Sequence, residues 1–167
     1  MPTFEQLFAA AQHSAVHLEM RDGYMRDDPV FTAWQAGRVE LDGDAEARWR
    51  ALVAQAVARG VAVRRARVVS EPLSDYVRFE HDITAQHNAA AGEQVRWLPR
   101  RQATTLALPG NDFWLFDGRW LLVNHFSGEG DWTDSEAVTD SSAVELCLAA
   151  FEAVWSRAVP HAEYRPT

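Results

Sequence analysis

Apolar residues recur every three or four positions in several stretches of the chain, which is the spacing of an amphipathic helix. Thr3 and Gln6 form a capping-box pattern at the start of the first stretch. Pro29 favours a second, short helix, and residues 44–59 carry a clear apolar stripe that Gly60 ends. The sequence therefore predicts three helices before residue 60.

Two further helices are predicted later in the chain. Glu71-Pro72 opens one that runs on to Gly92, because proline is tolerated in the first turn of a helix. The last helix begins at Ser141 or Ser142 and ends before Pro160. The apolar stripe that we expect to pack it onto a sheet consists of Val144, Leu148, Phe151 and Trp155.

Runs of β-branched and aromatic residues indicate the strands. Residues 61–70 and 94–98 are predicted strands on either side of the fourth helix. Residues 113–126 have the pattern of a β-hairpin that turns at Asp117-Gly118, a favoured pair for a two-residue turn. Residues 128–140 are glycine-containing and acidic, and we expect them to form a loop.

This order of elements predicts an α/β fold with a mixed sheet covered by helices. A strand–helix–strand crossover implies a parallel pair, and the hairpin adds antiparallel strands. We expect one domain over residues 1–167. Within it, residues 1–59 are predicted to be a mainly helical cap in which 15–20 is at most a short strand, 60–160 an α/β core, and 161–167 a loose tail.

Composition excludes several classes of protein. All 16 basic residues are arginine, so Schiff-base chemistry, a Walker phosphate loop and a lysine nucleophile are excluded. No apolar run reaches the roughly 20 residues of a membrane helix, and the N-terminus lacks the pattern of a signal peptide. Cys147 is the only cysteine, which excludes an intramolecular disulfide and a CxxC metal site. Together these features lead us to expect a cytoplasmic protein.

Charge is distributed unevenly along the chain. The net charge of −8 argues against a free-standing nucleic-acid binder, which is usually basic. Residues 59–101, however, hold eight arginines and five acidic residues, a net charge of +3, so the rest of the chain carries −11. An arginine-rich middle segment of this kind suits an acidic partner or an anionic ligand.

Four segments of the chain carry a resemblance to a known family. They are Arg65–Tyr76, Val95–Arg100, Pro109–Asp117 and Ala150–Trp155. Together they resemble an uncharacterised actinobacterial domain-of-unknown-function family, and the similarity covers nearly the whole chain. Members of that family are often encoded beside helix-turn-helix regulators, so the resemblance implies a link to transcriptional control.

The order of elements also resembles the phospholipase-D-like domain of some bacterial regulators. The shared order is strand, helix, strand, a strand pair with an aspartate turn, and a helix with Phe and Trp four apart. Active enzymes of that kind need a His-x-Lys pair, and no histidine of this chain has lysine two positions later. The resemblance therefore implies a phospholipase-D-like half that is non-catalytic.

The usual catalytic and metal motifs are missing. His13 and His17 lie four apart, as metal ligands on a helix do, but no HExxH pattern surrounds them. No serine lies in a GxSxG elbow. Cys147 stands between two leucines and is expected in the core. We expect neither a metal site nor a cofactor, and the sequence favours a protein that is not an enzyme.

The best candidate site is polar and lies where predicted strands end or begin. Ligands of open α/β sheets bind beyond the carboxyl ends of the strands, and guanidinium groups beside an aromatic ring suit phosphate or carboxylate. A self-satisfied salt-bridge network is the competing interpretation. The candidate residues are Glu71, Asp75, Tyr76, Arg78, Arg96, Arg100, Arg101, Asn111, Asp112 and Trp114.

These observations favour a non-catalytic regulatory or binding module that is an accessory to a transcription regulator. It would bind a partner protein, such as a helix-turn-helix regulator encoded nearby, or a small anionic effector. One alternative is a hydrolase that uses a carboxylate pair such as Glu71 and Asp112. A second is a nucleic-acid binder that uses the arginine-rich segment. The sequence predicts no membrane partner and leaves the oligomeric state open.

Overall fold

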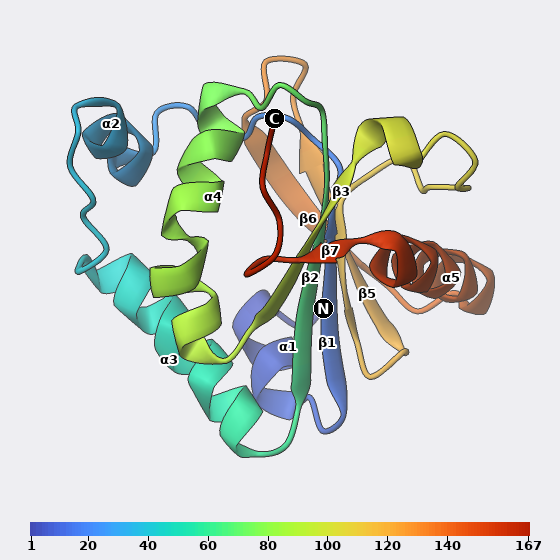
Figure 1. The fold of residues 1–167 in the computed structure, drawn as a ribbon. Coiled ribbons are helices and arrows are strands. Elements are labelled where there is room, and N and C mark those ends of the chain that lie inside the picture. The colour runs from blue at the N-terminus through green and yellow to red at the C-terminus, as the bar shows by residue number, and fades with distance from the viewer.

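A computed structural model describes all residues, 1–167. It confirms the α/β class, because one seven-stranded sheet lies between helices on both of its faces (Figure 1). The strands are β1 (Ser14–Glu19), β2 (Ala62–Val69), β3 (Gln94–Pro99), β4 (Phe113–Phe116), β5 (Trp120–Phe126), β6 (Trp132–Val138) and β7 (Val159–Pro160). The helices are α1 (Phe4–Ala10), α2 (Pro29–Gln35), α3 (Asp44–Ala58), α4 (Asp75–His87) and α5 (Ser141–Arg157), with short 3-10 helices η1 (Ala89–Ala91) and η2 (Arg100–Gln102).

The strand order in the sheet is β6-β5-β4-β1-β2-β3-β7. Strands β1, β2 and β3 run parallel, and β4, β5, β6 and β7 each pair antiparallel to a neighbour. The predicted crossover from β2 through α4 to β3 and the predicted β4–β5 hairpin are both confirmed. The sheet is therefore mixed, with β6 and the very short β7 at its edges.

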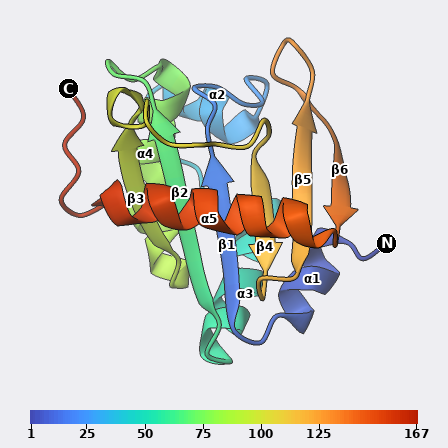
Figure 2. The same ribbon diagram turned by 90° about the vertical axis from the view of Figure 1, so that its right-hand side faces the viewer.

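The helices form two layers of unequal composition. Helix α5 alone crosses one face of the sheet, as Figure 2 shows, and contacts five of its strands. It packs through Phe151 and Trp155 onto a core cluster that includes Leu18 and Val68. Helices α1, α2, α3 and α4 lie on the other face (Figure 1). The two sides of each strand therefore meet different surroundings.

The expectation of a mainly helical cap over residues 1–59 needs correction. Strand β1 lies at the centre of the sheet, between β2 and β4, and five of its six residues are buried. His17 and Glu19 interrupt its apolar pattern, which is why residues 15–20 gave only a weak strand signal. Residues 1–59 are consequently part of the same body as the rest of the sheet.

Two other boundaries differ from the sequence prediction. Helix α4 begins at Asp75 rather than at Pro72, because the hydroxyl of Ser74 accepts a hydrogen bond from the N–H of Val77 and so caps the helix. The predicted acidic loop over 128–140 contains β6. This edge strand is exposed along most of its length, so its residues show no alternation of polar and apolar positions.

The chain's last segment is less loose than expected. The ring of Tyr164 is buried and stacks on Trp97 with ring centroids 5.4 Å apart, and its hydroxyl donates to Glu71. In α5 the predicted stripe is also partly wrong. Leu148 is 37% exposed, and the buried Cys147 takes its place at the spacing of three and four residues from Val144 and Phe151.

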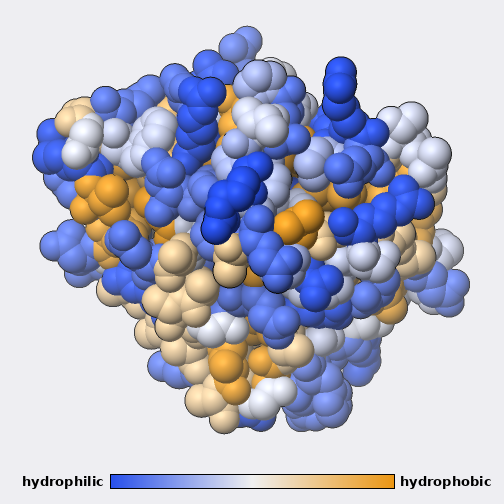
Figure 3. All heavy atoms as spheres, in the orientation of Figure 1, coloured by the Kyte–Doolittle hydropathy of each residue, from blue (hydrophilic) through white to orange (hydrophobic).

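The face of the molecule seen in Figure 3 is mostly polar. In the orientation of Figure 3, hydrophilic residues cover most of the face, and apolar groups show only in small patches between them. No helix combines the length and the apolar character that spanning a membrane requires.

Candidate functional site

The predicted polar residues meet only in part at one end of the sheet. Strands β2 and β3 finish there, and β4 starts there because it runs antiparallel to β1. Glu71, Arg100 and Arg101 line one cavity of about 320 Å³, together with Ser70. The structure thus brings these residues from two strand ends to one cavity, and we call the group the sheet-end rim.

Arg100 is the structural centre of the sheet-end rim. Its Nε donates to the hydroxyl of Ser70 at 3.0 Å, and its Nη2 donates to the backbone carbonyls of Met20 and Val68. Asn111 and Asp112 line a neighbouring cavity of about 300 Å³ that also contains Arg100. Arg100 therefore uses these donors to hold the ends of β1, β2 and β3 together.

The structure places the other predicted residues elsewhere. Arg96 lies on the α5 face, with its guanidinium 4.2 Å from the centre of the Trp155 ring. Asp75 and Arg78 form an exposed ion pair of 3.4 Å on α4. Tyr76 is buried among the aromatic residues of α2 and α4, and Trp114 stacks on His17. The rim prediction was therefore too broad.

The two carboxylates suggested for a hydrolase do not share a cavity. Glu71 Oε2 accepts from the hydroxyl of Tyr164 and the backbone N–H of Thr167. Asp112 lies in a different cavity and accepts from the backbone N–H of Met20 and from the hydroxyl of Tyr24. The pair therefore lacks the common space in which two carboxyl groups would act on one substrate.

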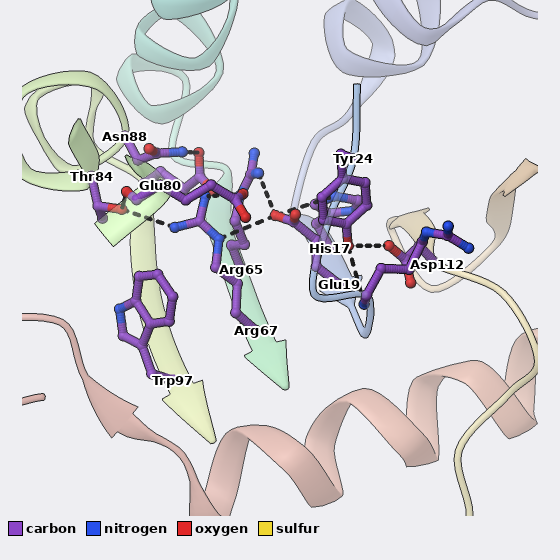
Figure 4. A network of polar contacts seen from close by, with 12 residues as sticks. His17, Glu19, Tyr24, Arg65, Arg67, Glu80, Thr84, Asn88, Trp97 and Asp112 are labelled. Carbon is purple, nitrogen blue, oxygen red and sulfur yellow. Dashed lines mark hydrogen bonds and ion pairs between the residues drawn. The ribbon is translucent and has the colours of Figure 1, made fainter. Parts of the chain in front are cut away.

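Sequence reasoning missed a group of charged residues that is buried beneath α4. We call it the buried ion network, and Figure 4 shows it. Nη1 of Arg65 lies 2.5 Å from Glu19, and Nε of Arg65 pairs with Glu93. Nε of Arg67 lies 3.3 Å from Glu19, and Nη2 of Arg67 lies 3.3 Å from Glu80. These five side chains come from two strands, a helix and the turn before β3.

The register of the sheet explains how the network assembles. Side chains of a strand alternate between its faces, so Arg65 and Arg67 point to the same side of β2. In the parallel pairing of β1 with β2, His17 lies opposite Arg65, and Glu19 lies opposite Arg67. Helix α4 then supplies Glu80 from above. The charges are therefore placed by the same register that pairs the two central strands.

Neutral polar groups complete the network. Arg67 Nη1 donates to the hydroxyl of Thr84 at 2.8 Å, and Asn88 Nδ2 donates to Glu93 at 3.2 Å. The Arg67 guanidinium also lies 4.8 Å from the centre of the Trp97 ring. Such partners matter because a buried charge is tolerated only when its remaining donors and acceptors are satisfied.

The carboxyl groups of the network differ in pKa. Burial disfavours the Glu19 carboxylate, but the adjacent Arg65 and Arg67 outweigh that effect and hold its pKa below its usual range. Burial raises the pKa of Glu80 to about 8, and the negative charge of Glu19 adds to the shift. At neutral pH Glu19 is therefore ionised and Glu80 is mostly protonated.

Two cavities open onto the network. The first, which we call the aromatic cavity, has a volume of about 380 Å³ and lies between β1, β2, β5 and α4. The second, the helix cavity, has about 460 Å³ and lies between α2, α3 and α4. Both are lined by Met25, Arg65, Tyr76 and Glu80. The volumes fall in the range typical of small-molecule sites.

His17 has a defined protonation state at the wall of the aromatic cavity. Its Nδ1 lies 2.7 Å from the carbonyl oxygen of Phe113, which can only accept, so Nδ1 carries the proton. Burial and the nearby Arg65 lower the pKa of His17 to about 3, and the ring is neutral. Its Nε2 is therefore an acceptor. The only fully buried, unpaired side-chain nitrogen or oxygen is in His81, so His17 Nε2 is reachable from the cavity.

A second hydrogen-bonded pair borders the same cavity. The hydroxyl of Tyr24 donates to Asp112, whose other carboxylate oxygen accepts from the N–H of Met20. Burial raises the pKa of Asp112 to about 6, although the bond from Tyr24 acts in the opposite direction. Asp112 is thus the one predicted rim residue that also belongs to the aromatic cavity.

A comparison with protein families places this chain. A family model described as "Domain of unknown function (DUF6879)" matches residues 2–166. The chain belongs to the DUF6879 family. This agrees with the resemblance of its sequence to a family of unknown function. A search of curated proteins finds no significant match to this DUF6879 chain.

Among solved structures, the DUF6879 chain is similar to TrmBL2, an archaeal chromatin protein reported to show a novel mode of DNA binding. The sequence identity is 14% and the TM-score is 0.49. The match covers 93% of this chain and 48% of the TrmBL2 chain, so the DUF6879 chain spans about half the length of that protein.

The structure also shows which groups the arginines in residues 59–101 of the DUF6879 chain contact. Arg65 and Arg67 belong to the buried ion network, and Arg64 pairs with Glu152 at 2.7 Å. Arg96 and Arg100 donate to backbone carbonyls. Most of the positive charge that the sequence concentrates in residues 59–101 is therefore used inside the fold.

A signal for the missed network is present in the sequence. Arg65 and Arg67 alternate with the apolar residues at positions 66 and 68, and His17 and Glu19 alternate in the same way with those at positions 16 and 18. Two strands with charges on one face and apolar residues on the other indicate charge pairing across the sheet. The acidic and basic residues on these two strands are complementary.

Proposed function

We propose that this DUF6879 chain is a non-catalytic regulatory module that binds a small molecule in the aromatic and helix cavities. The observation that carries the proposal is the placement of the buried ion network as the floor of both cavities. Replacing buried ion pairs by apolar residues is often neutral or stabilising, so stability alone gives little reason to keep such a network. A cavity with fixed, oriented charges has the character of a recognition site.

His17, Cys147 and the two nearby serines do not assemble a general base with a nucleophile. A general base works best when its pKa lies near the operating pH, whereas the pKa of His17 is about 3. Cys147 is buried on the opposite face of the sheet, in the α5 core cluster. Ser70 and Ser74 both donate to Asp22, the first to its carboxylate and the second to its backbone carbonyl.

The test is a fragment screen followed by nuclear magnetic resonance of the labelled protein. Met25 lines both cavities, so Met25→Trp should obstruct both with its larger indole side chain and abolish binding while the fold persists. Val39→Trp is the matched control, because Val39 is exposed and lines neither cavity. The proposal fails if no fragment binds, or if fragments bind Met25→Trp as well as they bind the unmodified protein.

Regulation would require that the ligand change the interaction with a partner. We further propose that the partner is a transcription regulator with a helix-turn-helix domain, of the kind that the family resemblance implies. The affinity of the purified regulator for this chain, measured with and without a cavity ligand, tests this step. Equal affinity in both conditions would contradict a regulatory role, since a ligand shifts a partner's binding only through coupling.

The sheet-end rim supports a second candidate, a small anionic effector. Its cavity of about 320 Å³ is lined mostly by polar residues and contains Arg101, which is exposed and free of the backbone contacts that hold Arg100. A charge-assisted contact from a guanidinium group suits a phosphate or carboxylate. Titration with inorganic phosphate should shift the resonances of Arg101 and Thr104 in the unmodified protein, and Arg101→Ala should remove the effect.

A further inference from the structure

The aromatic cavity holds a surplus of hydrogen-bond acceptors over donors. The carboxyl groups of Glu19, Glu80 and Asp112 face it together with Nε2 of His17. Among the donors on its wall, those of Arg65 and Tyr24 are engaged, whereas the hydroxyl of Tyr76 and the amide N–H groups of Asn124 have no partner in the protein. Arg65 pairs with Glu19 and Glu93, and the hydroxyl of Tyr24 donates to Asp112.

Carboxyl groups outnumber guanidinium groups around the cavity, so its charges also favour a positively charged ligand. Arg65 and Arg67 are shared among Glu19, Glu80 and Glu93, while no guanidinium makes an ion pair with Asp112. The two carboxyl groups with raised pKa values, Glu80 and Asp112, both line the aromatic cavity. A positive charge placed in the cavity would favour the ionised form of both.

His17 supplies an independent sign of the missing partner. The residue is 7% exposed, its Nε2 accepts no hydrogen bond from the protein, and this nitrogen lies 3.6 Å from an oxygen of Glu19. That oxygen already accepts from Nη1 of Arg65 and Nε of Arg67, so Nε2 of His17 is the acceptor that lacks a partner. A ligand N–H group within hydrogen-bond distance of Nε2 would satisfy it.

The remaining wall of the cavity is aromatic. Tyr24, Tyr76, Phe126 and Trp132 surround the acceptors, and Trp132 is 51% exposed at the end of β6. Aromatic faces attract cations, most strongly where water is excluded. They also bury apolar area of a ligand. The walls thus suit a molecule that joins a positive charge to an apolar group.

We propose that the aromatic cavity binds a small organic cation, a primary or secondary ammonium group carried on an aromatic or bulky apolar group. The ammonium lies among Nε2 of His17 and the carboxyl groups of Glu19, Glu80 and Asp112, and its two or three N–H groups donate to those within reach. The apolar part lies against Tyr76, Phe126 and Trp132. This inference rests on the proposed function and names the class of ligand for the same site. The sequence suggested a small anionic effector. For this cavity we propose a cation instead, because the carboxyl groups that face it repel an anion.

Matched probes test the charge directly. Phenethylammonium, phenylethanol and phenylacetate share one carbon frame and differ in charge, and Nα-acetyl-lysine methylamide presents an ammonium as a protein side chain would. Calorimetry at pH 8 and resonance shifts of the full chain measure the binding of each. We expect phenethylammonium to bind at least about tenfold more tightly than each of the other three, because only it combines the cation with a ring.

Two substitutions locate the site. Glu80→Gln and Asp112→Asn each replace a carboxyl group, which a bound cation would hold in its ionised form, by an amide of the same size that cannot ionise. We expect each to weaken phenethylammonium binding by about tenfold or more. Asp134→Asn is the matched control, because it makes the same change of charge on exposed β6 outside the cavity. It should change the affinity less than about twofold.

Each of the following outcomes would contradict the proposal that the cavity binds an organic cation. Equal or tighter binding of phenylethanol or phenylacetate, lost in Met25→Trp, would refute the cation while leaving the proposed function standing. Tighter binding of the lysine analogue would indicate a protein side chain as the occupant. Phenethylammonium binding that survives both Glu80→Gln and Asp112→Asn would place the probe elsewhere. No binding by any probe would refute the ligand class, and the fragment screen would then decide the proposed function separately.

Discussion

Glu19 and Glu80 offer a sharp test of the charge state of the buried network. Both lie over the same arginines, yet the structure makes Glu19 an ionised carboxylate and Glu80 a mostly protonated one at neutral pH. Replacement by glutamine imitates a protonated carboxyl group. Glu19→Gln therefore removes a charge that the folded protein uses, whereas Glu80→Gln replaces a neutral group by another neutral group.

The magnitudes follow from the contacts. Glu19 lies 2.5 Å from Arg65 and 3.3 Å from Arg67, so Glu19→Gln leaves two buried guanidinium groups without the carboxylate that both of them contact. Removing one partner from a buried pair costs about 3–5 kcal/mol. Glu80→Gln should cost less than about 1 kcal/mol at pH 6, since the amide can still bond to Glu19 and Arg67.

Urea denaturation monitored by fluorescence is the assay. With a slope of about 2 kcal/mol per M, Glu19→Gln should lower the midpoint by about 1.5–2.5 M at pH 6, and Glu80→Gln by less than about 0.5 M. Glu145→Gln, an exposed change on α5, is the control and should leave the midpoint nearly unchanged.

The pH dependence has a definite sign. The folded pKa of Glu80, about 8, lies above its ordinary value of 4.5, so the folded state binds more protons than the unfolded state between these values. Its contribution to stability is therefore complete below about pH 4.5 and is lost as the pH rises through 8. Wild type should weaken relative to Glu80→Gln between pH 5 and pH 9. A constant difference over this range, or equal costs for Glu19→Gln and Glu80→Gln at pH 6, would refute the assignment of charge.

Three further predictions concern the frame of the fold. Trp155→Ala should destabilise by about 3–5 kcal/mol because the ring is buried against the sheet, while the half-exposed Leu148→Ala should cost far less; equal thermal melts for the two would contradict the packing. Asp117→Ala should cost about 1–2 kcal/mol, since its carboxylate accepts from the N–H groups of residues 12, 13 and 14. The pKa of Asp117 is lowered because these bonds outweigh burial, so that contribution is present above pH 3.8 and lost in acid, as an acid titration of both proteins would show. Cys147 should react with a thiol reagent only on unfolding, because burial raises its pKa; rapid labelling of the folded protein would disprove its burial.

Much of the fold could be predicted from local pattern. The β-branched and aromatic runs of β2 and β3, the Asp117-Gly118 turn and most of the stripe of α5 are local properties, and the structure bears them out except at Leu148. Strand β1 was underrated for a physical reason. Its His17 and Glu19 are charged or polar inside the fold because they meet Arg65 and Arg67, which lie more than forty residues further along the chain.

The candidate site shows the same limit. Strand ends locate polar residues from sequence alone, and Glu71, Arg100 and Asp112 do lie at one end of the sheet. However, whether a side chain reaches the site also depends on the face of the sheet to which it points. Arg96 lies against Trp155 on the α5 face, whereas Trp114 stacks on His17 on the opposite face. The cavities themselves depend on how α2, α3 and α4 pack, which no short segment specifies.

The central position of β1 has a consequence for the order in which the molecule can fold. This strand pairs with β2 on one side, but its partner on the other side, β4, follows it by about a hundred residues. Pairings between distant segments close late, because the loop entropy must be overcome before the contact is gained. Until β4 is in place, β1 presents an open edge of backbone donors and acceptors beside a partly covered face. Intermediates of this kind tend to associate with one another, so refolding yield should fall as protein concentration rises, and a short peptide with the sequence of β4 should compete for that open edge.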